Sequence, residues 1–76
     1  MKYVISSQDV SKLVKDFTYH APKNDQPQRY EEIRAKGKEM AELIMVDCPV
    51  SRETSIALSR LEEAVMWANA AIARNE

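Results

Sequence analysis

Apolar residues recur at helical spacing along three stretches of the chain. The longest stretch lies in the last third, where steps of three and four residues alternate in a coiled-coil-like seam: Leu58, Leu61, Val65, Ala68 and Ile72. An earlier stretch forms one face of a second helix, with Tyr30, Ile33, Gly37, Met40, Ala41 and Ile44. Leu43 lies beside this face. A short third stretch contains Val10, Leu13, Val14 and Phe17. The pattern predicts an all-α fold in which a short helix precedes a long helical hairpin.

Capping residues and prolines set the expected helix boundaries. Ser7 is predicted to cap the short helix and Ser51 the last one. Pro27 suits the first turn of the middle helix, with Asp25 or Gln26 before it as the cap. The short connection around Pro49 predicts that the two long helices are antiparallel neighbours. Residues 1–76 then form one domain, divided into a mobile tail at 1–7, a short helix at 8–17, a loop at 18–26, and long helices at 27–46 and 51–75.

The last helix is apolar on nearly every side. Between positions 64 and 73 only Asn69 is polar, and small residues repeat at sevens beside the main seam at Ala57, Ala64 and Ala71. Such a helix is normally buried on more than one side, yet a chain this short has few elements to surround it. We expect it to serve as core and as self-association surface; packing within its own monomer is the alternative. Asn69 is expected to fix the register of a helical assembly, or else to contact a partner.

The chain has one cysteine, one histidine and one glycine, and the first two limit the disulfide and metal chemistry open to it. Cys48 is the only cysteine and His20 the only histidine, so an internal disulfide and a Cys/His zinc site are both excluded, and no cofactor is expected. We expect Cys48 to be a small buried filler rather than a reactive thiol. The lone thiol and the absence of a long apolar run indicate a protein of the reducing cytoplasm that does not enter a membrane. Gly37 in mid-helix indicates a close helix contact, a close ligand approach or simple tolerance.

Charge and loop composition favour a small anionic ligand over long nucleic acid. The formal net charge is −1, with acidic and basic residues interspersed, so no concentrated cationic face is available for a duplex backbone. The loop at 18–26 instead gathers Tyr19, His20 and Lys23, groups that recognise bases and phosphates. Tyr19 would alternatively just close the end of the hairpin. His20 is expected a helix length away from Cys48, which argues against a Cys–His catalytic pair.

Four segments together resemble one known family, the small phage-encoded anti-CBASS proteins that act as cyclic-nucleotide sponges. They are residues 17–22 (FTYHAP), 29–34 (RYEEIR), 48–53 (CPVSRE) and, most specifically, 57–75 (ALSRLEEAVMWANAAIARN). The resemblance implies a compact homo-hexamer that traps cyclic dinucleotides between paired subunits and cyclic trinucleotides on the three-fold axes. The family's base-stacking tyrosine falls on Tyr19, a cationic residue of the first long helix on Arg34, and a C-terminal arginine that serves the trinucleotide on Arg74.

Taken with this resemblance, the sequence predicts a homo-oligomer that sequesters cyclic dinucleotides and trinucleotides without cleaving them, in the cytoplasm of an infected bacterium. Tyr19 would stack on a base, Arg34 together with Lys23 would meet phosphate, and Arg74 would serve a second pocket. Two other functions remain open. One is a purely structural or protein-binding helical oligomer, and the other is a cyclic-nucleotide hydrolase that uses His20 as general base.

Overall fold

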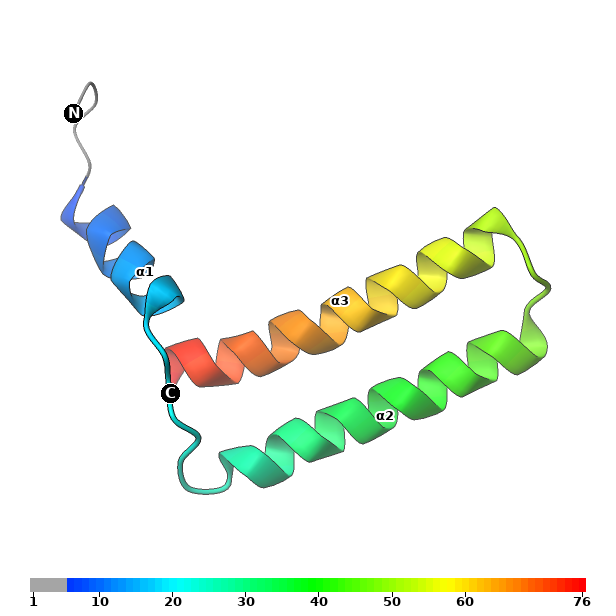
Figure 1. The fold of residues 1–76 in the computed structure, drawn as a ribbon, viewed down its shortest axis with the longest axis horizontal. Helices are drawn as coiled ribbons and strands as arrows, with labels where there is room; N and C mark the ends of the chain where they lie inside the picture. The colour runs from blue at the N-terminus through cyan, green and yellow to red at the C-terminus, as the bar shows by residue number, and fades with distance from the viewer. Residues whose placement is uncertain (1–5) are drawn as a thin grey trace.

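A computed structural model describes residues 6–76, and in that range the chain consists of three α-helices without any strand (Figure 1). They are α1 (Ser7–Phe17), α2 (Gln26–Asp47) and α3 (Arg52–Asn75). The all-α prediction is confirmed for these residues. Positions 1–5 of the expected tail lie outside the described residues, so its predicted mobility stays a prediction.

The helix boundaries follow the capping residues, with one correction. Ser6, rather than the predicted Ser7, caps α1, because its side chain accepts a hydrogen bond from the amide of Asp9 at 3.1 Å. The two adjacent serines have the same chemistry, so sequence alone did not separate them. Ser51 caps α3 as predicted, and its hydroxyl accepts from the amide of Thr54 at 3.1 Å.

Helices α2 and α3 lie side by side and antiparallel, as the short connection predicts (Figure 1). Members of the two apolar patterns are half-buried on both helices: Tyr30, Ile33, Gly37, Ala41 and Ile44 on α2, and Leu58, Leu61, Val65, Ala68 and Ile72 on α3. Met40, which the pattern assigns to the same face of α2, lies at its edge and is exposed. The contact surface is therefore one narrow stripe on each helix.

Gly37 marks the closest approach of the two helices. A Cβ atom at this position would lie 2.6 Å from Cγ2 of Val65. That is shorter than real Cβ contacts, and the χ1 angle of a β-branched residue in a helix has one strongly preferred value. Of the three interpretations of Gly37 left open by the sequence, the structure supports a close helix contact.

A polar cluster joins the start of α2 to the end of α3. The guanidinium of Arg29 donates to both carboxylate oxygens of Glu76, with Nη1 at 2.8 Å from Oε2, and also contacts Asp25. Gln26, only 3% exposed, donates to Glu76 at 3.3 Å and accepts from the hydroxyl of Tyr30 at 3.4 Å. Hydrogen bonds from Arg29 and then from Gln26 lower the pKa of Glu76 to about 2. We call these residues the clasp, since they hold the open end of the hairpin together.

The other end of the hairpin is uncovered, and it contains a second correction. Cys48, expected to be a buried filler, is exposed and has a free thiol. It forms the C-cap of α2, where its amide donates to the carbonyl of Ile44 at 2.9 Å. No further element of the described chain packs over this connection, so the thiol faces solvent. Burial statistics for cysteine do not apply to a site without a covering layer.

The chain forms a thin layer rather than a closed core. Its Cα atoms extend over 50 × 37 × 13 Å, and the radius of gyration is 17.0 Å, against about 11 Å for a compact domain of this length. Among residues 6–76 no hydrophobic side chain is buried. Packing within the monomer covers only one stripe of α3: the row Ala57, Ala64 and Ala71 is exposed, and so is Trp67. Whether α3 also serves as a self-association surface stays a prediction. Within the described range, no helix is long and apolar enough to cross a membrane.

Candidate functional site

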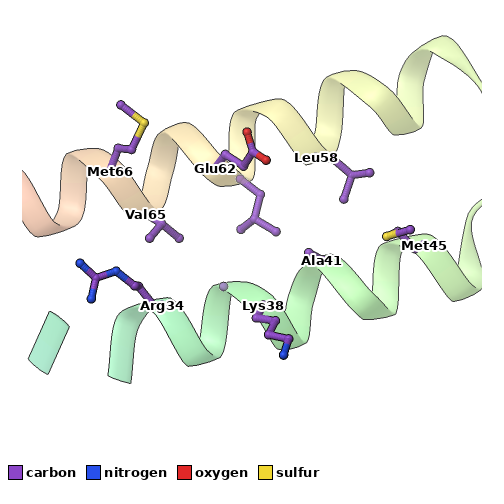
Figure 2. Close-up of a pocket in the computed structure, with 10 residues that line it drawn as sticks. Arg34, Lys38, Ala41, Met45, Leu58, Glu62, Val65 and Met66 are labelled. Carbon is purple, nitrogen blue, oxygen red and sulfur yellow. The ribbon is translucent and has the colours of Figure 1, made fainter. Parts of the chain in front are cut away.

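A groove runs between α2 and α3, and we call it the hairpin groove (Figure 2). Its volume is about 520 Å³. Apolar residues from both helices line it together with three charged ones: Gly37, Ala41, Met45, Leu58, Leu61, Val65 and Met66, with Arg34, Lys38 and Glu62. Figure 2 shows Leu58 and Val65 pointing from α3 toward α2, with Arg34 at one end of the groove and Met45 at the other. The groove is an elongated apolar surface with cations on its α2 edge.

The two cations of the hairpin groove have only weak partners within the chain. Arg34 lies 3.3 Å from Glu31, three residues earlier on α2, and its side chain is 58% exposed. Lys38 is 4.0 Å from Glu42. Exposed pairs at this helical spacing contribute about 0.2–0.5 kcal/mol, so a phosphate or a partner carboxylate readily replaces either glutamate.

A second groove lies where α1 meets the end of α3, and we call it the junction groove. It has a volume of about 340 Å³ and is lined by Lys12, Lys15, Asp16, Trp67, Ala70, Ala71, Arg74 and Asn75. Lys12 donates to Asp16 at 2.6 Å, and Arg74 lies 3.8 Å from the same carboxylate. The hydrogen bond from Lys12 lowers the pKa of Asp16, and Arg74 adds to the effect. Since Lys15 brings a third cation, the groove keeps an excess of positive charge.

Arg74 also contacts the aromatic member of the junction groove. Its guanidinium carbon lies 5.8 Å from the centroid of the Trp67 ring, within the range of a cation–π contact. Arg74 is in the last turn of α3, as the sequence predicts, where a cation is favoured by the helix dipole. A flat cation beside an indole face is a suitable surface for an anionic aromatic ligand.

The loop between α1 and α2 presents its aromatic ring to solvent. Tyr19 is 83% exposed, whereas Nε2 of His20 lies 2.8 Å from the carbonyl oxygen of Lys15 and ties the loop back to α1. Lys23 begins the turn into α2, since its carbonyl accepts from the amide of Gln26 at 3.0 Å. Asn24 has a φ of 53°, a left-handed conformation that asparagine tolerates better than most residues.

The four predicted ligand residues do not share one groove within a single chain. Arg34 lines the hairpin groove and Arg74 lines the junction groove. Tyr19 and Lys23 lie on the loop, and neither lines either of these two grooves. A single copy therefore offers its aromatic and cationic groups on separate surfaces.

Comparison with known families gives a match over most of the chain. A family model described as "Acb2/Tad1, hairpin domain" matches residues 9–73. The chain belongs to the Acb2/Tad1 hairpin family. This is the family of anti-CBASS sponges that the resemblance of the four segments indicates, so that assignment is confirmed. No curated protein and no solved structure matches the chain.

The Acb2/Tad1 match covers the parts of the chain that hold the predicted ligand residues. It begins in the first turn of α1, includes the loop and α2, and ends within the last turn of α3. Tyr19, Lys23 and Arg34 fall inside it, and Arg74 is the residue directly after its end. The helical hairpin as a whole is thus the matched unit, with α1 as part of it.

Two further cations belong to the surfaces of this Acb2/Tad1 hairpin, and sequence reasoning missed both. Lys12 and Lys15 reach the junction groove from α1, and Lys15 lies 3.4 Å from the side-chain oxygen of Asn75. The amphipathic pattern of α1 shows that both lie on its polar side. It does not show that this side faces α3.

Groups that would perform catalysis are not assembled in the described residues. His20 lies in the loop before α2 and Cys48 directly after it, a separation of about 33 Å along a helix of 22 residues. Across residues 6–76, no three His, Cys, Asp or Glu side chains group in a way that could hold a metal ion. The family to which the chain belongs is known for sponges rather than enzymes.

Proposed function

We propose that this protein binds cyclic oligonucleotide second messengers, both cyclic dinucleotides and cyclic trinucleotides, and sequesters them without cleavage. The membership in the Acb2/Tad1 hairpin family is the observation on which this rests. The protein would act in the cytoplasm of an infected bacterium and there reduce the free concentration of CBASS signals. A sponge needs tight binding at high capacity and no chemical step.

The active form in this proposal is a homo-oligomer, a hexamer by family resemblance. The accessible surface of the chain is 6515 Å², whereas a folded monomer of 8.7 kDa exposes about 4,700 Å². The excess of about 1,800 Å² is mostly helix surface that pairing with other copies would cover. The side-chain oxygen of Asn69 is inaccessible to solvent and has no hydrogen-bond partner within residues 6–76, so the expected role of Asn69 in an assembly stays a prediction.

Pockets between subunits would unite groups that lie apart in one chain. Tyr19 of one copy would stack on a base, an interaction that contributes about 1–3 kcal/mol per base. Arg34, with Lys23 beside the loop, would bind phosphate through charge-assisted hydrogen bonds. Arg74 and the junction groove would serve the larger cyclic trinucleotide. Repetition by symmetry gives each half of a cyclic ligand the same set of contacts.

The test is calorimetric titration with a panel of cyclic dinucleotides and trinucleotides, followed by heat release and chromatography of the bound ligand. We expect intact cyclic ligand to be recovered. Linear product would instead establish the hydrolase, and absence of binding across the panel would favour a structural or protein-binding oligomer.

Substitutions assign the binding residues. Tyr19→Ala should lower dinucleotide affinity by about 5- to 150-fold, the equivalent of one lost base stack, while the oligomer persists. Arg34→Ala should also weaken binding. Arg60→Ala is its matched control, since Arg60 is an exposed arginine paired with a glutamate three residues away, at 3.0 Å, but lies outside both grooves. Equal loss of affinity in the two arginine variants would contradict the assignment of Arg34.

A further inference from the structure

Helix α1 has an apolar stripe that no other part of residues 6–76 covers. Val10, Leu13, Val14 and Phe17 form this stripe and are between 44% and 84% exposed. The helix has 11 residues, and isolated helices of that length are marginal in water. An amphipathic helix obtains most of its stability from packing of the apolar face. The stripe of α1 therefore needs a covering surface.

The covering surface is not the hairpin of the same chain. Helix α1 meets α3 through polar contacts, Asp16 with Arg74 at 3.8 Å and Lys15 with Asn75 at 3.4 Å. At 100° per residue, Lys15 lies opposite the stripe and Asp16 lies on its flank, so the side of α1 that contacts α3 is the side away from the stripe. The stripe consequently points away from the chain's own hairpin, and Figure 1 shows α1 projecting away from it.

The hairpin groove matches the stripe in length and character. From Val10 to Phe17 the stripe extends about 10 Å, and the groove extends about 12 Å along α3, from Leu58 to Met66. The groove is apolar except for Arg34, Lys38 and Glu62 at its edges. Both surfaces are exposed in the single chain.

We propose that α1 of one copy docks its apolar stripe into the hairpin groove of a second copy. This rests on the self-association in the proposed function and names the surfaces that form it. The arm is α1, and the receiving site is the groove between α2 and α3. Each copy gives one arm and accepts one, either by exchange within a pair or around a ring.

The exposed area fits this arrangement. A standard interface takes about 800 Å² from each partner. The excess of about 1,800 Å² on each chain corresponds to two such contributions, one from the arm and one from the groove.

Charge complementarity favours the same partner. On one flank of the stripe lie Asp9 and Asp16, and on the other lie Ser7 and Ser11. The α2 edge of the groove has Arg34 and Lys38. With the N-terminal end of α1 near Arg34, the right-handed turn of the helix directs the acidic flank toward this cationic edge, and Asp9 comes to lie between Arg34 and Lys38.

Disulfide trapping tests the docking on the full chain with Cys48→Ser. One chain has Val14→Cys in the stripe and a second has Ala41→Cys in the groove; the two are unfolded together in urea, refolded and oxidised. We expect a disulfide-linked dimer containing one chain of each kind. Ala35→Cys, on an exposed α2 position outside the groove, replaces Ala41→Cys as the matched control and should give no such dimer.

Two results would overturn the proposal. For the first, a third chain has both Val14→Cys and Ala41→Cys. An intrachain disulfide in this chain, with no linked dimer in the mixture of single-cysteine chains, would place α1 on its own groove. The other is no disulfide in either sample. Sedimentation and nucleotide titration of the Cys48→Ser chain show whether only the docking of α1 fails or self-association fails as well. An oligomer that binds nucleotides without cross-linking refutes only the arm, whereas a monomer at all concentrations also refutes the self-association.

A charge reversal gives an independent check. Asp9→Lys should weaken self-association by about two- to five-fold, the range for one exposed ion pair. Lys38→Asp in the same chain should restore it, because the pair then re-forms with reversed sign between copies. Additive weakening in the double variant would contradict the predicted neighbours.

Discussion

The contact between Gly37 and Val65 gives a prediction whose sign depends on the background. Gly37→Ala alone gains helix propensity, about 1 kcal/mol at an interior position. It also places a Cβ 2.6 Å from Cγ2 of Val65, and overpacking of this kind costs about 1–3 kcal/mol. We therefore expect a net loss of unfolding free energy of up to about 2 kcal/mol.

In a Val65→Ala background the same substitution should be stabilising. The clashing methyl group is absent there, so the helix-propensity gain of up to about 1 kcal/mol remains. The coupling free energy of the double-mutant cycle then equals the clash, about 1–3 kcal/mol.

Urea unfolding of the four proteins, followed by circular dichroism, measures this cycle. All four are compared at one protein concentration, because the stability of an oligomer depends on it. A coupling free energy near zero would refute the close approach of α2 and α3 at this position. Loss of stability on Gly37→Ala in both backgrounds would do the same.

Two further predictions concern the ends of the hairpin. The folded pKa of Glu76 lies near 2, below its ordinary value of 4.5, so the stabilisation by the clasp should be complete above pH 4.5 and be lost as the pH falls from there toward 2. Glu76→Gln should thus lower the unfolding midpoint at pH 7 but not near pH 2, and an equal loss at both would contradict the clasp. Ser51→Ala removes the bond to the amide of Thr54 and should cost about 0.5–2 kcal/mol in urea unfolding, whereas Ser59→Ala, within α3, should cost nothing. Equal effects would disprove the cap.

Local signals were sufficient for the helices. Pro27 and Ser51 act through the backbone of their own first turn, so the predicted starts of the two long helices differ from the observed ones by a single residue. The spacing of apolar residues likewise identified the two faces that meet in the hairpin. The correct prediction of Gly37 as one member of that face rests on the same short-range periodicity.

Contacts between distant positions were not predictable in this way. Arg29 and Glu76 are separated by 47 residues, and nothing in either neighbourhood indicates the other. The same limit applies to Lys12 and Lys15, since the direction of α1 depends on its ion pair with the end of α3. Exposure of Cys48 depends on what covers the connection, which no local pattern specifies. The role of Tyr19 stays a prediction for a related reason, because its pocket would need a second copy.

The clasp explains how the hairpin keeps its register with so little apolar contact. The side chains of Arg29 and Glu76 are 35% and 41% exposed, so their ion pair is solvated and adds modestly to stability. Its bidentate geometry nevertheless aligns the two helices, while the contact at Gly37 brings them close. Orientation is thus fixed by a few specific contacts, and the larger apolar side chains, Phe17 and Trp67 among them, stay on the surface. For the proposed oligomer that division is physically useful, because the surface that a closed core would consume remains available for other copies.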